Sequence, residues 1–223
     1  MRAGVVRVPA GGRIRSNSTV RDGPAENVLA PASDRMAKLL DKIIVIDLES
    51  TCWEGPPPEG QSSEIIEIGI ALVDVASMRR ESKQSILIKP VRSEVSEFCT
   101  KLTTLTATDL ADAGSLADAT KILKKQFQSQ DRLWASWGDY DRRQFERVCK
   151  DFGVGYPFGI SHLNVKTLFA IAHGLESEVG LDVAYAQLSL TMEGTHHRGV
   201  DDAWNIAGLL CGLFAPLRKS NAT

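Results

Sequence analysis

The chain has 223 residues, of which 43% are hydrophobic and 24% charged, a composition typical of a globular protein with a sizeable core. Its formal net charge is −2, which argues against broad electrostatic coating of nucleic acid but permits binding of a few nucleotides in a cleft. The four cysteines lack metal-finger spacing, and no apolar run is long enough to span a bilayer or to form a secretory signal. We therefore expect a cytoplasmic protein with free thiols that acts away from membranes.

Residues 1–35 differ in composition from the rest of the chain. Six arginines and three acidic residues give this segment a net charge of +3, which leaves −5 for the remainder. Because it lacks an apolar periodicity, we predict a disordered basic extension followed by a folded domain over 36–223. Three other interpretations stay open: an artefact ahead of a natural start at Met36, a transit peptide for organellar import, and an arm that contacts RNA.

The first half of the folded part is dominated by strand signals. Residues 43–48 form an apolar run that predicts a buried strand, and a turn-rich loop follows over 50–61. Further strands are predicted over 64–75 and 84–89. The short polar connection between these two strands favours an antiparallel meander.

Helical signals dominate the second half. The apolar spacing and the flanking turn residues predict one strand over 132–137, a strand end that runs into a helix over 161–174, and helices over 94–102, 107–111, 115–128, 140–152 and from 199 onward. This order of elements is that of an α/β protein with a mixed sheet.

Acidic residues mark the ends of several predicted elements. Asp47 and Glu49 close the first strand at i and i+2, so both side chains point to one face. A buried strand tolerates such carboxylates when a divalent cation compensates them, and paired oxygen ligands suit Mg²⁺ or Mn²⁺. Asp141 follows a later strand, Asp202 lies in the first turn of the last helix, and His197 precedes that helix. This combination predicts metal-dependent hydrolysis of a phosphodiester.

The same residues resemble the DEDDh family of 3′→5′ exonucleases, with Asp-x-Glu on a first strand, a later Asp and a C-terminal His-x-x-x-x-Asp. The similarity covers roughly residues 41–214. The segments that resemble the branch of histone-mRNA and enhanced-RNAi exonucleases are 49–55, 64–69, 98–103, 136–138 and 194–203.

The resemblance implies a ribonuclease H-like fold, with a mixed five-stranded sheet flanked by helices, and an exonuclease domain over 36–223. It also implies two Mg²⁺ or Mn²⁺ ions and removal of nucleotides from the 3′ end of single-stranded RNA. Asp47, Glu49 and Asp202 would then hold the first metal ion, and Asp47 would bridge to the second. Asp141 would complete the site, and His197 would be the general base that activates the attacking water.

Substrate contacts are implied by the same resemblance. The matching segments place one group of residues beside the terminal nucleotides, where stacking on apolar side chains would tolerate any base. Interior packing is an equal alternative for the two aromatic members of this group. The predicted substrate-binding residues are Ser50, Thr51, Trp53, Phe98, Leu102 and Thr103.

Two of these site residues have neighbours with the same spacing. His196 and Asp201 are separated by as many residues as His197 and Asp202. Alignment of Ala203 with the family favours the second pair, and neighbours about 100° apart on a helix cannot both face the sheet.

Alternatives also exist for Asp141 and for the function. Asp139 competes with Asp141, which is favoured by the aromatic Tyr140 before it. A DNA exonuclease and a catalytically silent nucleic-acid-binding module on the same fold are the competing functions. The SAP-type domain and the zinc finger common in larger relatives are not evident, which favours a general nuclease over a stem-loop-specific one. The sequence does not identify a protein partner.

Overall fold

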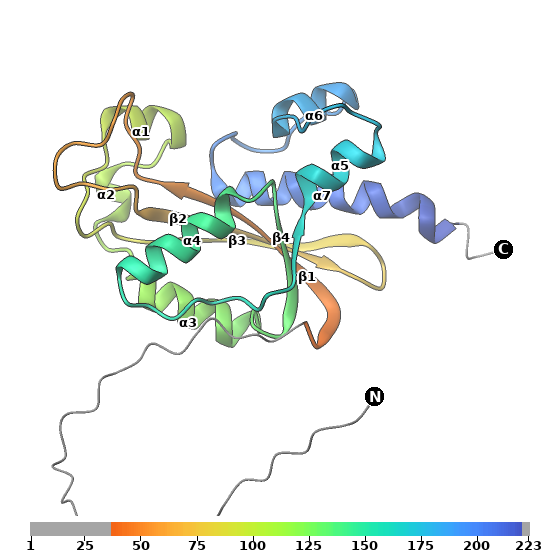
Figure 1. Cartoon of the computed structure of the whole chain (residues 1–223), viewed down its shortest axis with the longest axis horizontal. Coiled ribbons are helices and arrows are strands. Elements are labelled where there is room, and N and C mark those ends of the chain that lie inside the picture. Colours follow the sequence, from red (N-terminus) through yellow and green to blue (C-terminus); the bar gives the residue numbers. More distant parts are fainter. Residues whose placement is uncertain (1–36, 220–223) are drawn as a thin grey trace, which may run out of the picture.

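The computed structural model describes residues 37–219, so the predictions for residues 1–35 lie outside the described range. Its centre is a mixed five-stranded sheet in the order β3-β2-β1-β4-β5, with helices on both faces (Figure 1). β1 pairs antiparallel with β2 and parallel with β4. The strands are β1 (Leu39–Ser50), β2 (Ile65–Asp74), β3 (Arg79–Leu87), β4 (Arg132–Ser136) and β5 (His162–Asn164). The predicted α/β architecture is confirmed.

Seven helices surround the sheet in the described part of the chain: α1 (Glu97–Thr103), α2 (Ala107–Leu110), α3 (Leu116–Gln126), α4 (Tyr140–Asp151), α5 (Val165–Ala172), α6 (Leu181–Gln187) and α7 (Gly199–Lys219). Six of them coincide with predicted helices. The short helix α6 was not predicted from the sequence. None of the helices within residues 37–219 combines the length and hydropathy that a bilayer crossing requires.

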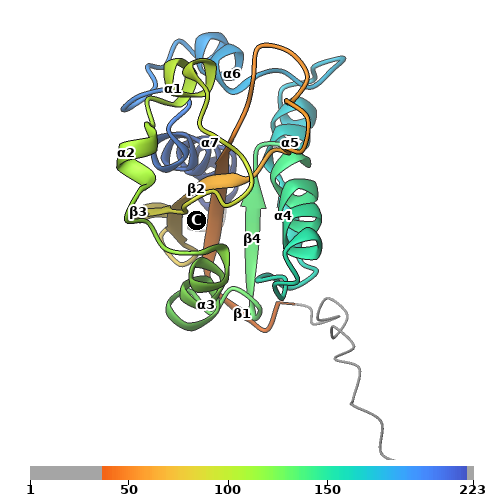
Figure 2. The ribbon, with the colours of Figure 1, turned by 90° about the vertical axis from the view of Figure 1, so that its left-hand side faces the viewer.

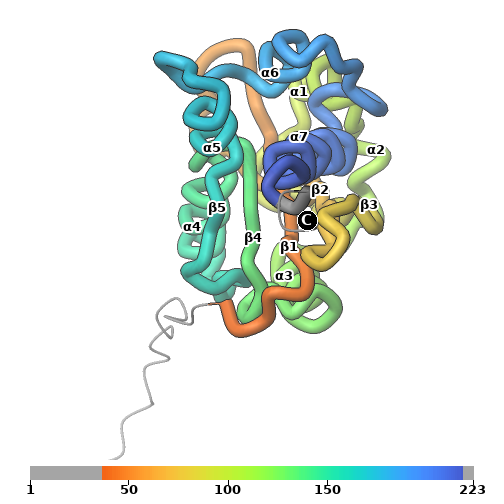
Figure 3. Tube along the Cα trace, turned by 90° about the vertical axis from the view of Figure 1, so that its right-hand side faces the viewer, coloured from red at the N-terminus to blue at the C-terminus, as the bar shows by residue number. Residues whose placement is uncertain are grey.

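Alternation along β1 divides the core into two layers. Ile44 and Ile46 pack with residues of α3 and α4, whereas Ile43 and Val45 pack with residues of α5, α6 and α7. Figures 2 and 3 show α7 lying across β1 and β2, with α4 and α5 beside β4. Because side chains alternate along a strand, Asp47 and Glu49 continue the row of Ile43 and Val45 toward α7.

The first turn of α7 sits against β2 at very short range. Asp47 of β1 is paired with Gly69 of β2. A Cβ atom placed on Gly69 would lie 1.8 Å from the carbonyl carbon of Gly199, the first residue of α7. Glycine at position 69 is therefore what lets the helix backbone occupy the space above the sheet. This contact brings the start of α7 next to the end of β1.

Candidate active site

A cleft of about 430 Å³ opens where the end of β1 meets the first turns of α4 and α7. All the residues predicted to act in catalysis line it, together with two of those predicted to bind substrate. The predicted residues in its wall are Asp47, Glu49, Ser50, Leu102, Asp141, His197 and Asp202. Four separate regions of the sequence therefore converge on one cleft.

Four acidic side chains converge at the floor of this cleft. Oxygen atoms of Asp47, Glu49 and Asp202 lie within 4.8 Å of one another. Glu49 is 8% exposed, Asp141 4% and Asp202 3%. Asp141 is held beside the end of β1, where its Oδ1 accepts the Leu48 N–H at 3.0 Å. The expected grouping of Asp47, Glu49, Asp141 and Asp202 is thus what the fold produces.

The neighbours that competed for these roles point elsewhere. Asp201 forms an ion pair with Lys83 at 2.6 Å and accepts the N–H of Thr195. Asp139 stands before α4 and forms an ion pair with Arg142 at 3.2 Å. Neither Asp201 nor Asp139 lines the cleft. The geometry therefore favours Asp202 and Asp141 as the site carboxylates.

Burial raises the pKa of three carboxyl groups in the cleft, and for Asp47 and Glu49 neighbouring carboxylates raise it further. Burial raises the pKa of Glu49 to about 9, and the nearby carboxylates of Asp202, Glu67 and Asp141 add to the effect. The pKa of Asp47 is also raised well above its usual range, first by burial and then by Asp141 and Glu49. Burial raises the pKa of Asp141 to about 7, although the Leu48 N–H opposes the shift. Burial and repulsion therefore both disfavour the charged form of these carboxyl groups.

The donor set fits divalent cations. In the described part of the chain, no lysine or arginine lies within ion-pair distance of Asp47, Glu49, Asp141 or Asp202. Buried carboxylates that repel one another are stabilised when a cation binds between them, and carboxylate oxygens are the ligands that Mg²⁺ and Mn²⁺ prefer. Asp47, Glu49 and Asp202 could hold one ion, with Asp141 held beside them at the end of β1.

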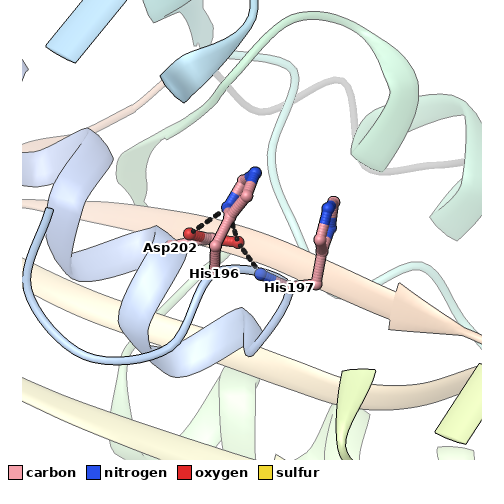
Figure 4. A group of neighbouring side chains, drawn as sticks. All are labelled: His196, His197 and Asp202. Carbon is pink, nitrogen blue, oxygen red and sulfur yellow. Dashed lines mark hydrogen bonds and ion pairs between the residues drawn. The ribbon is translucent and has the colours of Figure 1, made fainter. Parts of the chain in front are cut away.

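Two adjacent histidines stand over Asp202 (Figure 4). The His196 Nδ1 lies 3.0 and 3.1 Å from the two carboxylate oxygens of Asp202, and the His197 backbone N–H donates to Oδ2 at 2.8 Å. The two rings are stacked with centroids 4.0 Å apart. Burial and the neighbouring His196 lower the pKa of His197. A neutral imidazole at position 197 can accept a proton near pH 7.

The remaining residues predicted to bind substrate lie outside the cleft wall. Thr51 and Thr103 have an exposed fraction of 0%. The Thr51 hydroxyl accepts the Glu64 N–H at 2.9 Å, and the Thr103 hydroxyl donates to a carbonyl within α1 at 2.9 Å. These two side chains therefore shape the elements beside the cleft and reach no ligand in it. Phe98 is 39% exposed and Trp53 is half-buried, so both are accessible.

Further residues that sequence reasoning did not place in the site also line the cleft, among them Tyr140, Trp137 and Asp182. Tyr140 is 58% exposed at its rim, and Trp137 donates from Nε1 to the Val179 carbonyl at 3.1 Å. Tyr140 and Trp137 belong to the segment just before Asp141, so their closeness in sequence to a predicted site residue could have indicated their position. Asp182 comes from α6, which has no motif that would have indicated its position.

Comparison with known proteins places the chain in a family. The family model RNase_T, described as exonuclease, matches residues 44–210, which includes every carboxylate of the cleft and His197. The chain belongs to the RNase_T exonuclease family. The resemblance to 3′→5′ exonucleases that the motifs indicated is thereby confirmed.

Relatives of this RNase_T chain include nucleases named for 3′→5′ activity. The rat 3′-5′ exoribonuclease 1 is 29% identical over 196 residues, which cover 82% of this chain and 55% of the rat protein. The Drosophila melanogaster 3′-5′ exonuclease Snipper is 25% identical, with 85% of this chain and 75% of that protein covered. The chain thus spans little more than half the length of the rat relative.

A solved structure shares the fold of this RNase_T domain. The nuclease domain of 3′hExo, a DEDDh family member whose structure was solved bound to rAMP, superimposes with a TM-score of 0.72 at 24% identity. The match covers 81% of this chain and 95% of that one. It supports the ribonuclease H-like exonuclease fold that the sequence predicted.

Proposed function

We propose that this chain is a metal-dependent 3′→5′ exoribonuclease that hydrolyses the terminal phosphodiester bond at the 3′ end of single-stranded RNA. The observation that carries the proposal is the convergence of Asp47, Glu49, Asp141 and Asp202 on one cleft, with a neutral His197 beside them. RNA is favoured over DNA because the exoribonuclease 1 relatives are named for RNA.

The residues of the cleft divide the reaction between them. His197 accepts the proton of a water molecule as the water oxygen attacks the scissile phosphorus, and the 3′-oxygen of the shortened chain leaves and takes up a proton. The products are a nucleoside 5′-monophosphate and an RNA one nucleotide shorter. Tyr140 and Leu102, which both line the cleft, contact the terminal nucleotide.

Two divalent ions, Mg²⁺ or Mn²⁺, complete this proposal. Asp47, Glu49 and Asp202 would hold one ion, and Asp47 with Asp141 would hold the second. When bound, the ions supply positive charge against the phosphate and make a water molecule more acidic. The protein carboxylates contribute the placement of that charge, since their positions on β1, α4 and α7 are fixed by the fold.

A time course on 5′-labelled single-stranded RNA with Mg²⁺ tests the proposal, run beside DNA of the same sequence. We expect a descending ladder on RNA that EDTA and Asp47→Asn abolish. A faster reaction on DNA would reassign the substrate to DNA. Absence of a ladder on both substrates, with Mn²⁺ also supplied, would refute the enzymatic proposal and favour a nucleic-acid-binding module.

A further inference from the structure

Glu67 is a fully buried carboxylate that the proposed chemistry does not use. It lies on β2 directly opposite Glu49 of β1, and its exposed fraction is 0%. A buried charge persists only when it is paired and hydrogen-bonded. The groups that donate hydrogen bonds to the Glu67 carboxylate therefore indicate its role in the fold.

The partners of Glu67 come mainly from the junction between the histidine loop and α7. The Arg198 Nε donates to Oε2 at 3.2 Å and Nη2 to Oε1 at 3.4 Å, while the Gly199 N–H donates to Oε2 at 3.1 Å. The Ser85 hydroxyl donates to Oε1 at 2.6 Å. Glu67 thus caps the first turn of α7 from a strand 132 residues earlier in the chain.

His197 directly precedes the two residues that bind Glu67, and it lines the cleft. Its backbone has a φ of +63°, a left-handed conformation that a non-glycine residue keeps only when its surroundings hold it. On its C-terminal side Arg198 and Gly199 are bonded to Glu67, and its own N–H is bonded to Asp202. The backbone that presents the imidazole is therefore tied to β2 through Glu67.

The Arg198 side chain faces the protein more than the cleft. It is 28% exposed, two of its nitrogens are bonded to Glu67, and its Nη1 lies 3.5 Å from the Thr104 hydroxyl. It does not line the cleft that contains the carboxylates. This placement argues against a direct contact between Arg198 and the scissile phosphate.

We propose that Glu67 and Arg198 are positioning residues for His197, which they serve by fixing the left-handed turn that directs the imidazole into the cleft. The inference rests on the proposed nuclease function. In this role the Glu67–Arg198 ion pair, which does not touch the reacting atoms, controls the rate of the chemical step and not the binding of substrate.

Steady-state kinetics on single-stranded RNA tests this role. Arg198→Ala should lower kcat by about 10- to 100-fold, the range expected when a catalytic group is misplaced by about 1 Å, and leave KM close to the wild-type value. Arg198→Lys, which keeps the charge and one contact to Glu67, should recover part of the loss. In a His197→Ala background, Arg198→Ala should cause no further loss, because its effect acts through His197.

The matched control is Arg132→Ala, which removes an arginine that binds Asp41 at 2.7 Å at the opposite end of β1. It should lower stability without changing kcat. A rise in KM with kcat unchanged for Arg198→Ala would overturn the inference in favour of RNA binding. A further loss in the His197→Ala background, or an unchanged kcat, would overturn it as well.

Hydrogen exchange of the metal-free protein separates this inference from the nuclease proposal. Amides of residues 195–200 should exchange faster in Arg198→Ala than in wild type or Arg132→Ala, as loss of the Glu67 contacts frees the turn. Equal exchange rates would overturn the positioning role whether or not the wild-type protein cleaves RNA. An inactive wild type with faster exchange in Arg198→Ala would refute the nuclease proposal and leave the turn-fixing contact established.

Discussion

Asp201 and Asp202 are adjacent in the chain but have opposite surroundings. Asp202 is 3% exposed and lies with Asp47 and Glu49, whereas Asp201 is turned toward Lys83. The two carboxylates are chemically identical, so their difference comes only from the rotation of about 100° per residue along α7. This pair allows the role of position to be tested with almost no change in composition.

Asp202→Asn should lower the nuclease rate by about 10³-fold or more, since residues that act as a catalytic unit fail together when one is removed. Asp201→Asn should leave the rate near the wild-type value, because the asparagine carbonyl can still accept the Thr195 N–H. Initial rates on labelled RNA measure both. Comparable losses in the two variants would contradict the assignment of Asp202 to the site.

The repulsion between Glu49 and its neighbours should make the metal-free protein less stable at high pH. The pKa of Glu49 is raised to about 9 by burial and nearby carboxylates, so the folded state holds a proton that the unfolded state releases above pH 4.5. The free energy of unfolding should therefore fall as pH rises from about 5 toward 9. Thermal melts in EDTA across this range measure the effect.

Glu49→Gln offers a matched test of the same repulsion. At pH 8 in EDTA it should stabilise the protein by about 1–3 kcal/mol, the cost of an unpaired buried group. Mg²⁺ should then raise the melting temperature of wild type more than that of the variant, because the ion stabilises only a state that binds it. Glu59→Gln, in the exposed loop, is the control. A variant less stable than wild type in EDTA would contradict the prediction.

At the scale of elements, the site depends on one close approach between a strand and a helix. Gly69→Ala would place a Cβ 1.8 Å from the Gly199 carbonyl carbon, and backbone atoms cannot yield as a flexible side chain would. We expect the free energy of unfolding to fall by about 3 kcal/mol or more. Overpacking usually costs about 1–3 kcal/mol, and a clash that must move backbone atoms reaches or exceeds the upper end of that range. Gly55→Ala, with open space around its Cβ, is the control for urea denaturation. Equal midpoints would contradict the role of Gly69.

The junction between β4 and β5 contains a histidine, His162, whose side chain is only 8% exposed. His162 Nε2 lies 2.9 Å from the Ser136 hydroxyl, and its ring contacts Trp134 with centroids 4.1 Å apart. Burial lowers the pKa of His162 to about 4, and the charge of Arg142 adds to the shift. The unfolded state therefore binds a proton below pH 6.5 that the folded state refuses, so the stability from this group is lost as pH falls from 6.5 to 4.

His162→Gln should remove about 3 kcal/mol of this acid dependence, the free energy of a shift from 6.5 to about 4. Chemical denaturation at pH 7 and at pH 4 measures it, and the variant should gain stability relative to wild type as pH falls. His173→Gln, at an exposed position at the end of α5, should leave the acid dependence unchanged. A parallel pH curve for His162→Gln would show that burial of this ring is not what limits acid stability.

At the scale of the whole molecule, the sequence was most informative where a periodicity and a charge coincide. Asp47 and Glu49 could be placed because they interrupt an apolar strand at a spacing of two. The choice of Asp202 over Asp201 needed the helical rotation and the family resemblance together. These positions depend on local geometry, which a sequence encodes directly.

Features that depend on packing between elements distant in the chain could not be predicted from the sequence. Asp182 enters the cleft on α6, a seven-residue helix that lies between two loops. Glu67 reads as a charge within an apolar strand, and only its pairing with Arg198 shows what satisfies it. The predicted contacts of Thr51 and Thr103 fail for the same reason, since both side chains turn into the interior.

The charge of the whole chain bears on how RNA would be held. Residues 1–35 carry a formal charge of +3 and residues 36–223 carry −5, which together give the net charge of −2, so residues 36–223 offer no excess of positive charge to a phosphate backbone. Binding should therefore rely on the terminal nucleotides in the cleft and on few phosphate contacts. This differs from a protein that follows a long single strand along a basic groove.

Salt dependence of RNA binding measures the number of those contacts. For Asp47→Asn, which should bind without cleaving, the slope of log Kd against log salt should be about 1–2, as two neutralised phosphates of a single strand would give. Deleting residues 1–35 should leave this slope unchanged if the +3 segment is a free extension. A slope of about 4 or more that falls on deletion would instead show that this segment contacts RNA, because each phosphate neutralised by a lysine or arginine adds about 0.7 to it.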